Sequence, residues 1–187
     1  MDEQEITLPS LLEERAHQDA ATYVIRDAIS QAEAELKVDS SRLAASRQIP
    51  LSVFGDDLPS CVRSCRVFVL RRNTEFKTER HPNSHQRVRS LRYAGKIRVF
   101  TDFDVNALTL QTDSGAAIVD RWVSLDANVW HQPVAGDQNW PVLTFHSADE
   151  SELIDEYADE SGITLAAPDE RASEDYSSSN CLPVARR

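Results

Sequence analysis

The chain has 187 residues, of which 20 are Lys or Arg and 31 are Asp or Glu, so its formal net charge at pH 7 is −11. Hydrophobic residues make up 41% of the chain, and no apolar run approaches the roughly 20 residues that a membrane-spanning helix needs. We therefore expect one globular domain with additional segments and no membrane association, and the acidic charge argues against nucleic-acid binding.

The N-terminal region is expected to be helical. Over residues 10–36 small and apolar residues recur on one helical face, and Ser10 and Glu13 have the spacing of a capping box. Proline, glycine and aspartate interrupt any regular pattern after this helix, so residues 1–59 are predicted to form a helical arm and a linker. The first ten residues, MDEQEITLPS, lack the basic and apolar parts of a secretory signal, which predicts a cytoplasmic protein.

Residues 61–100 form a basic block in this acidic chain, with 11 bases and 2 acids. In one interpretation these charges lie on solvated faces and attract the acidic flanks weakly. In the other, the block draws an anionic substrate or partner toward it. The positions of six arginines decide between the two: Arg71, Arg72, Arg87, Arg89, Arg92 and Arg98.

The middle of the chain is predicted to be all β. Short runs of β-branched and aromatic residues follow one another, with turn signals between them. These runs are residues 65–71, 86–92, 96–101, 106–112, 115–123 and 141–146. No helix-length pattern separates them, so residues 60–148 are predicted to form a β-barrel or sandwich.

A short helix and a tail are expected after the last strand. Ser147 and Glu150 repeat the capping-box spacing, and an apolar stripe follows on an acidic background, which predicts a helix over residues 149–162. Residues 163–187 are rich in Asp, Glu, Ser and Ala, with little to bury, which predicts a flexible tail.

A candidate metal site lies in the first half of the β region. Glu79 and His81 share one face of an extended segment, and Gln86 can return to that face on the next strand. His131 would complete a set of two histidines and one carboxylate, which leaves coordination positions open for Fe(II) and O₂ chemistry or for other Lewis-acid work. Gln86 would then be a weak fourth ligand or would orient the others.

The remaining histidines have simpler interpretations. His85 is an alternative ligand from the same turn, unless it faces outward like its odd-numbered neighbours. His17 is expected on the exposed side of a helix. His146 follows the strand WPVLTF and is expected to be a hydrogen-bonded residue at a strand end rather than a ligand.

The stretch from about residue 65 to residue 157 resembles the cupin superfamily, whose fold is a small β jelly roll. The segment from Glu79 to Gln86 is similar to the first cupin motif, with Glu79 in place of its first histidine, Gln86 in place of its carboxylate, and Gly95 closing the next hairpin. The segment 126–131 is similar to the second motif and keeps its histidine, with Asn128 in place of a glycine that takes a left-handed turn.

The resemblance implies a mainly β, cupin-type double-stranded β-helix with N-terminal helices and a short C-terminal helix. It also implies a divalent metal held by Glu79, His81, His131 and Gln86, with Fe(II) favoured over Mn, Ni or Zn, and a homodimer. The small polar or anionic substrate would be oriented by nearby side chains, for which the candidates are Arg89, Arg92, Trp130 and Trp140.

Three functions remain open, since cupins include enzymes of several classes and proteins without a metal. The first is a metal-dependent enzyme, with a dioxygenase favoured over an isomerase or lyase. The second is a non-catalytic ligand-binding or regulatory module with an altered or empty metal site. The third is a filled barrel in which the histidines are hydrogen-bonded polar groups.

Overall fold

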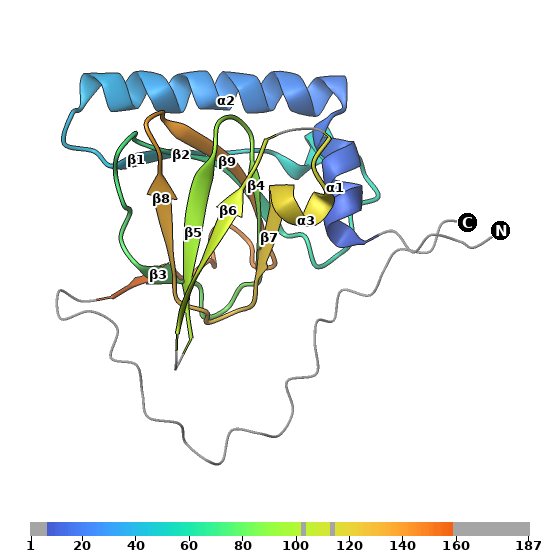
Figure 1. Cartoon of the computed structure of the whole chain (residues 1–187). Helices are drawn as coiled ribbons and strands as arrows, with labels where there is room; N and C mark the ends of the chain where they lie inside the picture. The colour runs from blue at the N-terminus through green and yellow to red at the C-terminus, as the bar shows by residue number, and fades with distance from the viewer. Residues whose placement is uncertain (1–6, 102–103, 113–114, 159–187) are drawn as a thin grey trace, which may run out of the picture.

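The computed structural model describes residues 7–101, 104–112 and 115–158. Two α-helices open the described chain, α1 (Leu8–Ala16) and α2 (Asp19–Val38). Thr7, rather than Ser10, caps α1: its hydroxyl accepts a hydrogen bond from the backbone N–H of Ser10. The predicted helical pattern is thus confirmed, with a break at residues 17 and 18 that divides it into two helices (Figure 1).

The strands that follow form two five-stranded antiparallel sheets. The first contains β1 (Ala44–Gln48), β2 (Ser64–Leu70), β9 (Trp140–His146), β4 (Gln86–Ser90) and β7 (Trp122–Leu125), in that spatial order. The second contains β10 (Glu156–Tyr157), β3 (Glu79–Arg80), β8 (His131–Ala135), β5 (Gly95–Phe100) and β6 (Val105–Leu110).

The strand order defines a jelly roll. Without the added edge strands β1 and β10, the sheets read β2-β9-β4-β7 and β3-β8-β5-β6. Apart from the β5–β6 hairpin, successive strands alternate between the sheets, and each sheet takes strands from both halves of the barrel. Eight strands in this order are the two interlocked Greek keys of a jelly roll. The predicted mainly β fold is therefore confirmed.

The first sheet is buried on both faces. Val67 and Leu143 face outward and pack with Ala28 and Leu36 of α2 in one apolar cluster. Val88, Val142 and Trp140 face inward and pack with residues of the second sheet in another. Strand β9 is consequently buried over its whole length, which explains why its sequence lacks the apolar–polar alternation of a strand with one wet face.

Several local predictions differ from the structure. The expected linker contains strand β1 and a short 3₁₀ helix, η1 (Leu51–Phe54), and α2 packs on β1. The expected strand over residues 115–123 contains a four-residue helix, α3 (Ile118–Arg121), and strand β7 begins at Trp122. Strand β8 carries Pro133 and matched no expected run.

The helix expected over residues 149–162 is not formed in its described part, residues 149–158, which contains turns and then strand β10. Tertiary hydrogen bonds outweigh its helical pattern: the Asn83 side chain donates to the Glu152 carbonyl and accepts from the Ile154 N–H, and β10 pairs with β3. The expected tail, residues 163–187, lies outside the described residues. No described helix is long and apolar enough to span a membrane.

Candidate metal centre

Three predicted ligands meet inside the barrel. Glu79 on β3 is the direct strand partner of His131 on β8, and His81 follows β3 by one residue. One ligand atom from each of these three side chains lies within 4.8 Å of the other two. All three residues are buried, with 8% or less of their surface exposed.

Contacts on the far side of each imidazole fix its orientation. The His131 Nδ1 lies 3.0 Å from the carbonyl oxygen of Val129, which can only accept, so Nδ1 is the donor and Nε2 is the atom available to a metal. The His81 Nδ1 lies 2.8 Å from Oδ1 of Asp155, so the negative charge of this carboxylate is next to the ring. A carboxylate or carbonyl behind a histidine is the usual support of a metal-ligating imidazole.

Asp155 is ionised in this position. Burial alone would raise the pKa of its carboxyl group, but the contact with His81 and the positive charge of Arg66 outweigh burial and lower the pKa to about 2. Asp155 therefore presents a full negative charge to His81 at neutral pH. Asp155 was not among the predicted site residues, because its sequence neighbourhood predicts a helix rather than a strand that reaches the barrel.

The donor atoms that face this space have no hydrogen-bond partner among the described residues. They are Nε2 of His81, Nε2 of His131, Oε1 of Gln86 and Nε2 of His146, all of them buried. A buried polar atom without a partner costs about 1–3 kcal/mol, so four in one place indicate a missing ligand or water. Two imidazoles, one carboxylate and one amide oxygen are a donor set that fits a divalent transition metal.

His146 extends this group beyond the predicted ligands. Its ring centroid lies 5.1 Å from that of His81, and its Nδ1 is 3.5 Å from the Ser84 hydroxyl. Burial, Arg66 and His81 lower the pKa of His146 well below its usual value, so the ring is neutral. His146 was predicted to be a hydrogen-bonded residue at a strand end. Because side chains alternate along β9, it lies on the same face as Thr144 and Val142.

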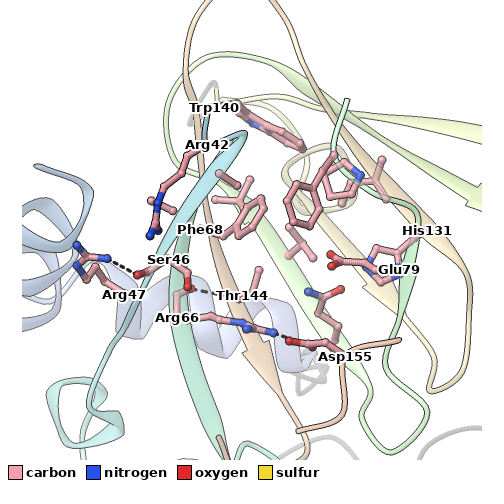
Figure 2. A pocket seen from close by; sticks show the side chains of 18 of the residues that line it. Arg42, Ser46, Arg47, Arg66, Phe68, Glu79, His131, Trp140, Thr144 and Asp155 are labelled. Carbon is pink, nitrogen blue, oxygen red and sulfur yellow. Dashed lines mark hydrogen bonds and ion pairs between the residues drawn. The ribbon is translucent and has the colours of Figure 1, made fainter. Parts of the chain in front are cut away.

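A cavity of about 340 Å³ adjoins the centre and lies between the two sheets (Figure 2). Glu79, Gln86 and His131 line one part of it, and Trp140 lines another. The cavity contradicts the third functional hypothesis, a filled barrel without an internal pocket. It also places Trp140, a predicted substrate-orienting residue, on the cavity wall, with its indole N–H donating to the Ser90 hydroxyl.

Three arginines line the cavity, Arg42, Arg47 and Arg66, and the predicted Arg89 and Arg92 are not among them. Arg66 lines the cavity from β2 and forms an ion pair with Asp155 at 3.4 Å, as Figure 2 shows. Arg89 instead faces α1 and pairs with the buried Glu13, and Arg92 pairs with Glu33 of α2. Arg89 lies outside the cavity because odd-numbered residues of β4 face the helices, and Arg92 lies in the segment that follows β4.

Two other candidates also lie outside the cavity. The His85 side chain is 41% exposed, and its Nδ1 lies 3.3 Å from Asp126. Its ring thus faces outward, as was expected if it follows its odd-numbered neighbours on the strand. Trp130 is partly buried beneath Arg80, whose guanidinium carbon lies 4.5 Å from the indole centroid.

Most of the basic block is paired with other parts of the chain. Besides Arg89 and Arg92, Arg98 pairs with Glu75, and the Arg71 guanidinium donates to the carbonyls of Leu36, Asp39 and Arg42. These contacts favour the interpretation in which the block attracts the chain's own acids and carbonyls.

Comparisons with known proteins concern the fold only. No family model and no curated protein sequence matches the chain. Among solved structures, the chain is similar to oxalate oxidase in complex with the substrate analogue glycolate, with 6% sequence identity, a TM-score of 0.47, and coverage of 62% of this chain and 57% of that chain. It is also similar to the salicylate 1,2-dioxygenase from Pseudoaminobacter salicylatoxidans, with 13% identity, a TM-score of 0.49, and coverage of 73% and 38%.

A third similar structure is the coconut allergen cocosin, with 15% identity, a TM-score of 0.48, and coverage of 63% of this chain and 29% of that chain. The chain therefore spans less than two thirds of the length of each of these proteins. All three contain cupin folds. The strand order of the chain itself defines the protein as a β jelly roll, with a candidate metal centre between its sheets.

Proposed function

We propose that this protein is a divalent-metal-dependent enzyme that acts on a small anionic molecule. The observation that carries the proposal is the meeting of Glu79, His81 and His131 beside a cavity, with the Nε2 atoms of both histidines buried and without a hydrogen-bond partner among the described residues. Satisfied structural histidines would have their ring nitrogens hydrogen-bonded within the protein.

The ligand roles follow from the donor atoms. Glu79, His81 and His131 would hold the metal through one carboxylate oxygen and the two Nε2 atoms, and Gln86 would add a weaker amide oxygen. When bound, the metal supplies Lewis acidity and open coordination positions next to the cavity. Fe(II) is our first choice, ahead of Mn, Ni and Zn, and dioxygenase chemistry is the first reaction class to test.

The residues around the centre have separate tasks. Asp155 and the Val129 carbonyl orient the two imidazoles through their Nδ1 atoms, and the apolar cavity wall excludes bulk water from a bound substrate. Arg66 places a positive charge in the same cavity, which favours an anionic substrate.

Elemental analysis tests the metal directly. Protein purified anaerobically without chelator is expected to hold close to one equivalent of a transition metal, and His81→Ala and His131→Ala are expected to abolish it. His85→Ala is the matched control, because His85 lies in the neighbouring turn but faces the rim. Metal content that both cavity substitutions leave unchanged would contradict the proposal.

A ligand-binding module without catalysis is the second candidate. Gln86 favours it, since a neutral amide is a weaker ligand than a carboxylate and would weaken metal binding. This candidate predicts that wild-type protein stays metal-free after reconstitution with Fe(II), Mn(II), Ni(II) and Zn(II), while small anions still raise its melting temperature.

A further inference from the structure

The cavity next to the candidate metal centre has two chemically different ends. Figure 2 shows Trp140 at one end and the Arg66–Asp155 pair at the other, with Phe68 between them. Phe76 adds a second phenyl ring that packs against Phe68 at a centroid distance of 5.1 Å. A ligand that fills this space must therefore be apolar in its body and polar at one end.

The polar end carries a cation with unused hydrogen-bonding capacity. A guanidinium group has five N–H donors, and among the described residues only Asp155 accepts a side-chain hydrogen bond from Arg66, at 3.4 Å. The Arg66 side chain is only 16% exposed, so its remaining donors are directed largely into a space shielded from bulk water. A carboxylate is the group whose geometry matches such donors.

The net charge of the cavity also favours a carboxylate ligand once a metal is bound. Glu79 and Asp155 contribute two negative charges and Arg66 one positive charge, which leaves one net negative charge. A divalent cation converts this to one net positive charge. Arg42 and Arg47 also line the cavity, but their charges are balanced by Glu35 and Asp39, so the net charge beside the candidate metal centre is set by Glu79, Asp155 and Arg66.

The size of the cavity limits the ligand to a small molecule. Its 340 Å³ lies near the lower end of the roughly 300–1,000 Å³ that ligand pockets span. We propose that the substrate is a small monocarboxylate with a ring-sized apolar body, whose carboxylate binds Arg66 and whose body packs against Phe68, Phe76 and Trp140. This inference rests on the proposed function, since it names the substrate class of the same site.

Binding of three probes to metal-reconstituted protein tests the inference by isothermal titration calorimetry. Benzoate has both the carboxylate and the ring, benzamide has the ring without the charge, and acetate has the charge without the ring. We expect benzoate to bind at least about tenfold more tightly than either of the other two. Equal affinities for benzoate and benzamide would contradict the role of Arg66, and equal affinities for benzoate and acetate would contradict the apolar half of the site.

Substitutions identify the residue that recognises the carboxylate. Arg66→Gln is expected to reduce the preference for benzoate over benzamide to about onefold. Arg66→Lys is expected to retain part of this preference, since lysine keeps the positive charge but lacks the paired N–H donors of the guanidinium group. Arg63→Gln is the matched control, because Arg63 pairs with Asp149 on the surface and lies outside the cavity. An undiminished preference in Arg66→Gln would overturn the inference.

Failure of this inference is distinguishable from failure of the proposed function. Wild-type protein that holds a metal but does not prefer benzoate refutes the substrate class alone. Wild-type protein that takes up no metal refutes the proposed function, and the benzoate-to-benzamide ratio of that metal-free protein then decides the substrate class by itself. The probe comparison in wild-type protein also decides the question if Arg66→Gln does not fold.

Discussion

Glu79 on β3 and His131 on β8 are direct partners across an antiparallel strand pair, and their facing atoms, Oε1 and Nε2, lie 3.6 Å apart. Strand register thus joins two parts of the candidate metal centre that are far apart in the sequence. Any change that displaces β3 or the start of β8 is expected to separate these ligands.

Asp155 is expected to strengthen metal binding through His81. Asp155→Asn removes the charge beside the His81 Nδ1, and loss of such an outer partner weakens metal affinity by about 10–100-fold. Competition with a chromophoric chelator measures the change. Asp149→Asn is the matched control, because Asp149 pairs with Arg63 near the surface. Equal metal affinity in the two variants would show that Asp155 does not support the ligand.

Gly95 is required by the packing of Trp140. A Cβ atom at Gly95 would lie 2.1 Å from Cδ2 of the indole ring, which is well inside van der Waals contact. Gly95→Ala is therefore expected to lower the free energy of unfolding by about 1–3 kcal/mol, the usual range for overpacking. Urea unfolding measures this, and Gly136→Ala, whose Cβ would approach only the Ala94 carbonyl at 3.5 Å, is expected to have a smaller effect.

Asn128 has the left-handed conformation that its place in the second motif suggested, with φ = 68°. Its backbone N–H donates to the His81 carbonyl at 2.9 Å, so the turn also supports a candidate ligand. Asn128→Ala is expected to cost about 1 kcal/mol or more, since residues other than Gly, Asn and Asp resist this conformation. Asn128→Gly is expected to keep the stability, and equal destabilisation by both would contradict the conformational explanation.

Glu13 makes the fold sensitive to acid. It is buried on α1 and accepts hydrogen bonds from Arg89, Arg121 and the Trp122 indole. Burial alone would raise the pKa of Glu13, but these hydrogen bonds and the charges of the two arginines lower it below 4.5. Because the folded-state pKa is lowered, the stabilisation is complete above pH 4.5 and is lost as the pH falls through the folded-state pKa.

Glu13→Gln tests this acid sensitivity. The substitution leaves two arginines without their buried counterion and is expected to lower the free energy of unfolding by about 3 kcal/mol at pH 7. The difference from wild type should shrink as the pH falls below 4.5. Glu33→Gln, which breaks the more exposed pair with Arg92, is expected to cost less than about 1 kcal/mol at any pH. A Glu13→Gln penalty that is independent of pH would contradict the electrostatic explanation.

Alternation and motif spacing predicted the jelly roll and the meeting of Glu79, His81 and His131. These features depend on strand periodicity, which can be recognised in a few consecutive residues of the sequence. The same periodicity places Arg66 on one strand face with Phe68 and Leu70, in an otherwise apolar run. The predicted substrate-orienting residues Arg89 and Arg92 lie outside the cavity, because Arg89 occupies an odd position of β4, which faces the helices, and Arg92 follows β4.

The position of Asp155 and the strands β1 and β8 could not be predicted from strand periodicity. Strand β10 has two residues, too few for a period, and the acidic sequence before it matches a helix that tertiary hydrogen bonds to Asn83 prevent. Strand β1, AASRQ, lacks β-branched residues and is held by pairing with β2. In β8, Pro133 lowered the strand signal, although β3 and β5 pair on either side of the strand.

The parity of the first sheet separates two engineering problems. In β2, β4 and β9 the even-numbered residues face the cavity and metal centre, and the odd-numbered ones face the two helices. A library restricted to even positions of these strands would alter ligand selectivity while the helix-facing layer stays intact. One restricted to odd positions would change thermal stability without altering the cavity wall, so the two traits can be evolved in parallel and recombined.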